Sequence, residues 1–96
     1  MTVINEIDDW PLFDHGHVAT ARWTDAQGER RVYLIARADG LFSFWGERFI
    51  KYPDEMYWIP DNVRGGKYDS EETAVREIHS AYPWSRDVLR ETRLKK

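Results

Sequence analysis

The sequence predicts one domain of the α+β class over residues 1–96, in which an antiparallel meander of four or five short strands precedes one or two C-terminal helices. Two features of the apolar pattern lead to this prediction. From residue 17 to residue 60, apolar and polar side chains alternate as they do along strands with one buried face. Near Asp69 the period changes to about 3.6 residues, which is the period of an amphipathic helix.

Turn residues divide the alternating region into strands. Asp39 and Gly40 form a dipeptide that is a strong hairpin signal between apolar runs, and residues 25–28 form another turn. The centre of the second strand, 32–36, is apolar on both faces, which indicates a central position in the sheet. Gly46 interrupts the third strand as a candidate β-bulge. The expected strands span residues 17–24, 29–37, 41–50 and 55–60, followed by a loop over 60–66 and a candidate edge strand at 66–68.

The helical region carries start and stop signals. Asp69 or Ser70 can cap the helix, and Asp69 with Glu72 has the spacing of a capping box. Pro83 should end this helix, and a second helix is expected after it, capped by Ser85. The apolar face of the first helix comprises Ala74, Val75, Ile78, Ala81 and Tyr82. The inward residues of the second would be Val88, Leu89 and Leu94.

Aromatic residues make up 15% of the chain, a share that a core or an interface has to absorb. Residues 10–13 (Trp-Pro-Leu-Phe) are expected to anchor on the core, and Ala19, Ala21 and Trp23 to share one face of the first strand. Tryptophans displayed on a sheet could also stack on sugars or bases, but sheets that bind RNA pair aromatic with basic residues. The acidic body of this chain favours core and protein-interface roles.

Charge is distributed unevenly along the chain. The formal net charge is −3, so the whole molecule lacks the basic footprint of a nucleic-acid binder. From Arg86 onward five basic residues stand against two acidic ones, a net of +3, which leaves −6 for the remainder. An acidic body favours encounter with a basic partner. A small nucleic-acid-binding domain that uses the basic C-terminus is an alternative.

The chain contains no cysteine, which excludes disulfides, thiolate zinc sites and cysteine nucleophiles and fits a cytoplasmic protein. The first residues show no basic region followed by an apolar stretch, so no signal peptide is expected. No run of about 18 apolar residues occurs, and no membrane association is expected.

No reaction motif is present. His15 and His17, with Asp14, could ligate zinc or nickel, but His79 has no fixed spacing to them, and a turn leading into a strand explains the pair. Neither a P-loop nor a nucleophile elbow occurs. We therefore expect no catalytic residue, no metal and no cofactor; a small enzyme that uses one of the histidines is an alternative.

Residues 66–77, with the sequence GKYDSEETAVRE, resemble the strand-to-helix junction of many small bacterial proteins, in which a last strand ends in Asp-Ser and a Glu-rich helix packs back on the sheet. Small immunity proteins of polymorphic toxin systems, including those of contact-dependent growth inhibition, are among them. The chain is similar to that class also in its size, acidic body and aromatic surplus. The resemblance implies an inhibitor of a toxin, and it assigns no functional residue.

These observations favour a non-enzymatic protein-binding domain: an immunity protein or antitoxin that occludes the active surface of a basic cognate toxin. An accessory or adaptor domain unrelated to toxins is the alternative. The stretch from residue 47 to residue 61 combines acidic side chains with aromatic anchors, the ingredients of a steered interface. The predicted contact residues are Glu47, Tyr52, Asp54, Glu55, Tyr57, Trp58 and Asp61.

Overall fold

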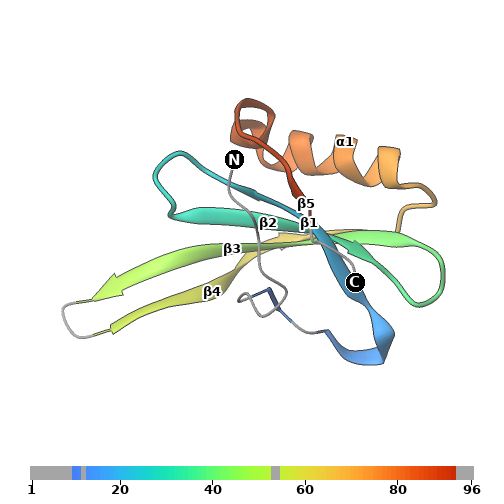
Figure 1. Cartoon of the computed structure of the whole chain (residues 1–96), viewed down its shortest axis with the longest axis horizontal. Coiled ribbons are helices and arrows are strands. Elements are labelled where there is room, and N and C mark those ends of the chain that lie inside the picture. Colours follow the sequence, from blue (N-terminus) through green and yellow to red (C-terminus); the bar gives the residue numbers. More distant parts are fainter. Residues whose placement is uncertain (1–9, 12, 53–54, 93–96) are drawn as a thin grey trace.

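A computed structural model describes residues 10–11, 13–52 and 55–92, and describes Asp14, Tyr52, Asn62 and Arg64 by their backbone alone. Figure 1 shows a twisted sheet with one helix lying over one of its faces. The elements in chain order are η1 (Asp14–Gly16), β1 (Val18–Thr24), β2 (Arg30–Ala36), β3 (Phe42–Tyr52), β4 (Glu55–Arg64), α1 (Glu71–Ala81), η2 (Pro83–Asp87) and β5 (Glu91–Thr92).

The sheet confirms the predicted fold class. Its strands lie in the order β4-β3-β2-β1-β5, and every neighbouring pair is antiparallel. The first four strands form the meander, and the short β5 returns to the free edge of β1. As its pattern indicated, β2 is central, and the five consecutive residues 31–35 are all buried.

β4 is longer than expected, since it continues to Arg64 through the stretch predicted as a loop. Its register with β3 shifts between Trp45 and Glu47, where two steps along β3 face the four steps from Pro60 to Arg64 in β4. The bulge therefore lies in β4, opposite Gly46, and not at Gly46 itself, which pairs in continuous register with Val32 of β2. The expected edge strand at 66–68 is a single bridge between Tyr68 and Phe42.

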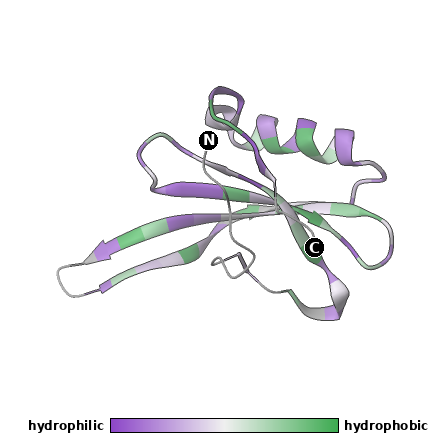
Figure 2. Ribbon diagram, viewed as in Figure 1, coloured by the Kyte–Doolittle hydropathy of each residue, from purple (hydrophilic) through white to green (hydrophobic). Residues whose placement is uncertain are grey.

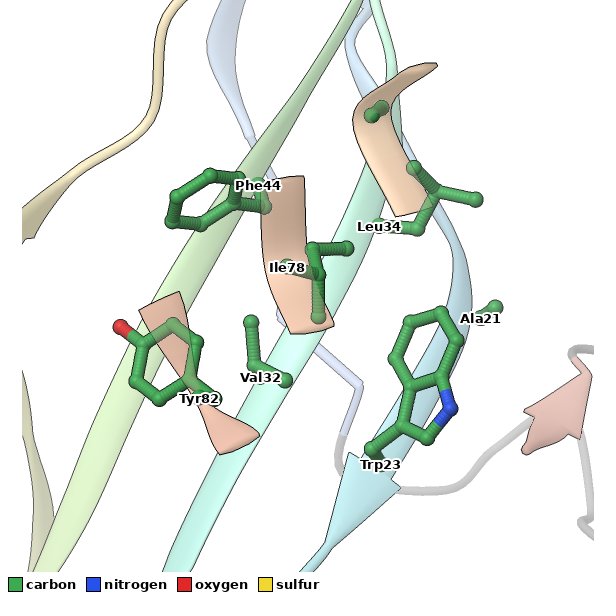
Figure 3. Packing of buried hydrophobic residues seen from close by; sticks show 8 residues of the cluster. Ala21, Trp23, Val32, Leu34, Phe44, Ile78 and Tyr82 are labelled. Atoms are coloured by element: carbon green, nitrogen blue, oxygen red, sulfur yellow. The ribbon is translucent and has the colours of Figure 1, made fainter. Parts of the chain in front are cut away.

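One face of the sheet carries the main core. Ile78, at the centre of the apolar stripe of α1, is fully buried against the sheet. Figure 3 shows Val32, Leu34 and Phe44 from neighbouring strands grouped around it. The buried members of this cluster are Ala21, Trp23, Val32, Leu34, Phe44, Ala74, Ile78 and Tyr82.

A second, smaller cluster of Trp10, Ala19 and Tyr33, with Phe13 packed against it, forms separately from the first. Trp10 and Phe13 therefore anchor on the core as expected, while Leu12 lies outside the described residues. The prediction that Ala19 shares a face with Ala21 and Trp23 is wrong. The register of β1 against β2 shifts between Ala19 and Ala21, and such a bulge reverses the face on which later residues lie.

The start of α1 follows the alternative that named Ser70. Ser70 Oγ accepts a hydrogen bond from the backbone N–H of Thr73 at 3.1 Å and caps the helix. The capping box between Asp69 and Glu72 does not form, because the capping residue is one position later. Glu72 still lies in the first turn, where its charge suits the helix dipole.

The predicted second α-helix is wrong. Pro83–Asp87 form a five-residue 3-10 helix, and the chain then returns as β5. Leu89, expected to face inward, is 86% exposed, and Leu94 lies outside the described residues. As a strand, β5 pairs with β1, and Glu91 Oε2 forms an ion pair with Arg22 Nε at 2.9 Å. A continuing helix would provide neither of these interactions.

Within the described part of the chain, no helix combines the length and the apolar character needed to cross a bilayer.

Replacing Ile78 with alanine is expected to lower the free energy of unfolding by about 2–5 kcal/mol, because a cavity would open in a fully buried site. Urea denaturation followed by tryptophan fluorescence measures the change. Glu77→Ala, on the exposed side of the same helix, is the matched control and should shift stability by less than about 0.5 kcal/mol. Equal midpoints for Ile78→Ala and the wild type would contradict the packing of α1.

Candidate protein-interaction surface

The sheet face opposite α1, called the open face below, carries an aromatic and charged cluster. Arg31 Nε donates to Glu47 Oε1 at 2.7 Å, and Trp45 Nε1 donates to Glu47 Oε2 at 3.0 Å. The Arg31 guanidinium carbon lies 3.8 Å from the ring centroid of Trp58. The Glu47 carboxylate therefore holds the Trp45 ring through one oxygen and Arg31 through the other. The Arg31 guanidinium in turn holds the Trp58 ring by a cation–π contact.

A cleft of about 700 Å³ lies beside this cluster. Phe13 and Trp45 contact each other there edge to face, with ring centroids 5.9 Å apart. Ile35 and Val63 add apolar surface, and the polar lining residues are His17, Arg37, Ser43 and Asp61. A concave site with apolar walls and a few polar groups has the character of a binding pocket for a side chain or a small molecule.

Ser43, His17 and Asp61 line the same cleft, but they do not form a catalytic relay. His17 Nδ1 accepts the backbone N–H of Ala38 at 2.9 Å, whereas the histidine of a triad donates from Nδ1 to its carboxylate. Asp61 instead accepts from the Tyr82 hydroxyl, whose single O–H is shared between Oδ1 at 2.9 Å and Oδ2 at 2.8 Å. No hydrogen bond joins the three side chains among the contacts of the described residues.

The Tyr82 contact ties the helix side of the molecule to β4. A Cβ at position 46 would overlap the Tyr82 hydroxyl and crowd Asp61, so Gly46 is required for their close approach. Burial and the hydrogen bond to Asp61 both raise the pKa of Tyr82 above its ordinary value. The β4 bulge opposite Gly46 contains Asp61, and the space left by Gly46 lets this carboxylate accept from Tyr82 at the edge of the cleft.

The ends of β3 and β4 form a two-stranded arm, residues 50–52 and 55–57. The register of β3 with β2 ends at Arg48, so no third strand within the described ranges supports the arm. Figure 1 shows it extending away from the part of the sheet that α1 covers, and in Figure 2 hydrophobic and hydrophilic segments are mixed along it. Met56 is 71% exposed and Tyr57 is 41% exposed on the arm.

The structure distributes the predicted contact residues over several environments. Glu55 and Tyr57 are exposed on the arm, and Trp58 is half-buried under Arg31. Glu47 and Asp61 already bind groups within the chain, which leaves them less able to attract a partner. Asp54 and the side chain of Tyr52 lie outside the described residues. The contact assignment as a whole stays a prediction.

Two residues of the surface were missing from the predicted set. Trp45, 37% exposed, borders the cleft, and Met56 is the most exposed apolar residue of the arm. The alternation of β3 and β4 places Trp45 with Glu47, and Met56 with Trp58, on the same face. The strand alternation in the sequence could therefore have identified both residues, because it places each of them on the same face as a residue that was predicted.

The histidines do not gather a metal site in the described part of the chain, where no group of three His, Cys, Asp or Glu residues could hold an ion. The rings of His15 and His17 lie 6.3 Å apart. His79 Nδ1 lies 2.6 Å from Ser85 Oγ, but Ser85 is fully buried and closed to substrate. This pair therefore links α1 to η2.

None of the family models, curated proteins or solved structures that were compared with this chain matches it.

Stability should fall in mild acid because of His79. Burial lowers the pKa of His79, and the charge of Arg86 adds to the effect. In the unfolded chain the His79 imidazole takes up a proton at about pH 6.5. The contribution of neutral His79 to the free energy of unfolding is therefore present above that pH and is lost as the pH falls through the lower pKa of the folded state. Urea midpoints measured from about pH 7.5 to about 5.5 should decline, as the ordinary histidine pKa lies within that window.

His79→Gln should flatten this decline, because glutamine has no proton to take up. His15→Asn is the control, since His15 is exposed and asparagine tolerates its positive φ of 63°. An unchanged slope in His79→Gln would show that other groups cause the pH dependence.

Proposed function

We propose that this chain is a non-enzymatic protein-binding domain whose partner docks on the open face and the adjoining arm. In its specific form, it is an immunity protein or antitoxin that covers the active surface of a basic toxin. The observation that carries the proposal is the fixed aromatic cluster of Trp45 and Trp58 around Arg31 and Glu47, next to an open cleft.

The composition of this surface is that of an interface hot spot. Binding energy in protein interfaces concentrates in Trp, Tyr and Arg residues that sit in or beside pockets. Here the ring of Trp45 is held by Glu47 before any partner arrives. Because the side chain is ordered in advance, less conformational entropy is lost on binding.

The arm supports the same proposal. An isolated two-stranded ribbon is only marginally stable in water, and this one leaves Met56 and Tyr57 exposed. Exposed apolar side chains next to an aromatic face mark a surface that a protein partner can cover.

The negative charge of the chain supports a basic partner. The acidic residues of the stretch 47–61 contribute less to this attraction than their number in the sequence suggested. Of its acids, Glu55 is exposed, while Glu47 and Asp61 are engaged internally. The steering field therefore comes from the acidic body as a whole, which carries −6 before Arg86. Toxins that attack nucleic acids are commonly basic, so an acidic inhibitor gains association rate.

The test is binding to a basic protein encoded beside this chain. Trp45→Ala should weaken the complex by roughly tenfold to a hundredfold, the usual effect of truncating a hot-spot aromatic. Titration calorimetry measures the affinity, and an assay of the neighbour's toxic activity measures neutralisation. Glu77→Ala, exposed on α1 away from the open face, is the matched control and should bind like the wild type.

Glu55→Lys should slow association and reduce its dependence on salt, with a smaller effect on dissociation. A neighbouring toxin that stays fully active and unbound in the presence of this chain would refute the immunity proposal. Tight binding to a partner without toxicity would favour an adaptor domain.

A further inference from the structure

The two edges of the sheet are protected differently. On one side the two-residue β5 pairs with Ala21 and Arg22, in the middle of the seven-residue β1. On the other side, no strand of the described chain pairs with the outer edge of β4. Proline, lysine and bulges are the usual protection of such an edge. In β4, Pro60 and the bulge opposite Gly46 protect only the C-terminal half. Residues 55–59, Glu-Met-Tyr-Trp-Ile, contain neither proline nor lysine.

The hydrogen bonds of β3 show which backbone groups of β4 point outward. Phe42 exchanges both of its backbone hydrogen bonds with Tyr68, on the side of β4. The N–H of Phe49 donates to Glu29 C=O at 2.8 Å, on the side of β2. Along a strand these directions alternate, so even-numbered residues of β3 bind β4 and odd-numbered residues do not.

The residues of β4 opposite odd-numbered residues of β3 therefore direct their backbone groups away from the sheet. These are Met56, opposite Lys51, Trp58, opposite Phe49, and Pro60, opposite Glu47. Met56 and Trp58 each present an N–H and a C=O at the edge, whereas Pro60 has no N–H to present. The usable edge thus ends at Pro60.

This pattern is complementary to itself in the antiparallel register centred on Tyr57. With Tyr57 opposite Tyr57 of a second copy, Met56 lies opposite Trp58, and each such pair can exchange both of its hydrogen bonds. A register moved so that Trp58 faces itself would set Met56 against Pro60, where a donor is missing. It would also set Glu55 against Asp61, a repulsive pair.

We propose that the chain forms a homodimer in which the β4 strands of two copies pair antiparallel, centred on Tyr57, and join the two sheets into one. The two-fold axis of such a pair is perpendicular to the sheet, so both α1 helices lie on one side and both open faces on the other. The pairing covers Met56, which is 71% exposed in the single chain. A contact confined to one strand edge is small, so association should be reversible and depend on concentration.

Self-association can be measured by size-exclusion chromatography with light scattering over a range of protein concentrations. The wild type should pass from monomer to dimer mass as concentration rises. Met56→Pro removes an outward N–H that β3 does not use and should weaken the dimer about tenfold or more, since the bond is lost twice by symmetry. Met56→Ala keeps that N–H and should weaken it less. A wild type that stays monomeric, or a Met56→Pro variant that associates like the wild type, would overturn the proposal.

Cross-linking tests the register without relying on the proline variant. Because the chain has no cysteine, Tyr57→Cys places a single thiol at the two-fold axis. A directly opposed, non-hydrogen-bonded pair brings Cα atoms about 4.5 Å apart, within the range of a disulfide. Oxidation should give a covalent dimer for Tyr57→Cys and much less for Glu55→Cys, which is exposed and faces Ile59. Equal cross-linking of the two variants would refute the register.

Discussion

Arg31 and Glu47 meet on the open face with side chains that are 9% and 12% exposed. Removing one partner of a buried ion pair costs about 3–5 kcal/mol, because the other charge is left behind without its counterion. Their pairing also positions two neighbouring side chains, because Glu47 accepts a hydrogen bond from the indole of Trp45 and Arg31 lies over the ring of Trp58. The aromatic surface proposed for partner binding thus follows from one ion pair.

The need for such a pair comes from the small number of covering elements. One amphipathic helix covers one face of the sheet, where Ile78 and Tyr82 close the main core. Among the described residues, the other face has only the small cluster around Trp10 to shield its centre. Charged and aromatic side chains that satisfy one another take the place of a second helix there. The charged groups of this face remain hydrated, and its aromatic rings supply the apolar surface that the proposed protein partner would cover.

The sequence predicted the meander, the central β2 and the buried stripe around Ile78, because these depend on local periodicity and turn residues. Gly46 marked the irregular region of the sheet, but the bulge itself lies in β4 opposite it. It did not predict the bulge that moves Ala19 to the other face, since nothing in a run of small residues marks a register shift. It also missed β5, which depends on the long-range pair of Arg22 and Glu91. In the candidate site, residue types were foreseen on β3 and β4, but their internal partners were not.

The hydrogen exchange of the Trp45 indole shows whether Glu47 holds this ring in solution. A heteronuclear NMR spectrum should show five indole N–H resonances, one for each tryptophan, and Trp45→Phe assigns the one that disappears. If Glu47 holds the ring, this resonance should be protected from hydrogen exchange in the wild type and should shift and lose its protection in Glu47→Gln. If the indole N–H of Trp45 exchanges at the rate of a solvent-exposed tryptophan in the wild type, and its resonance does not move in Glu47→Gln, Glu47 does not hold the ring.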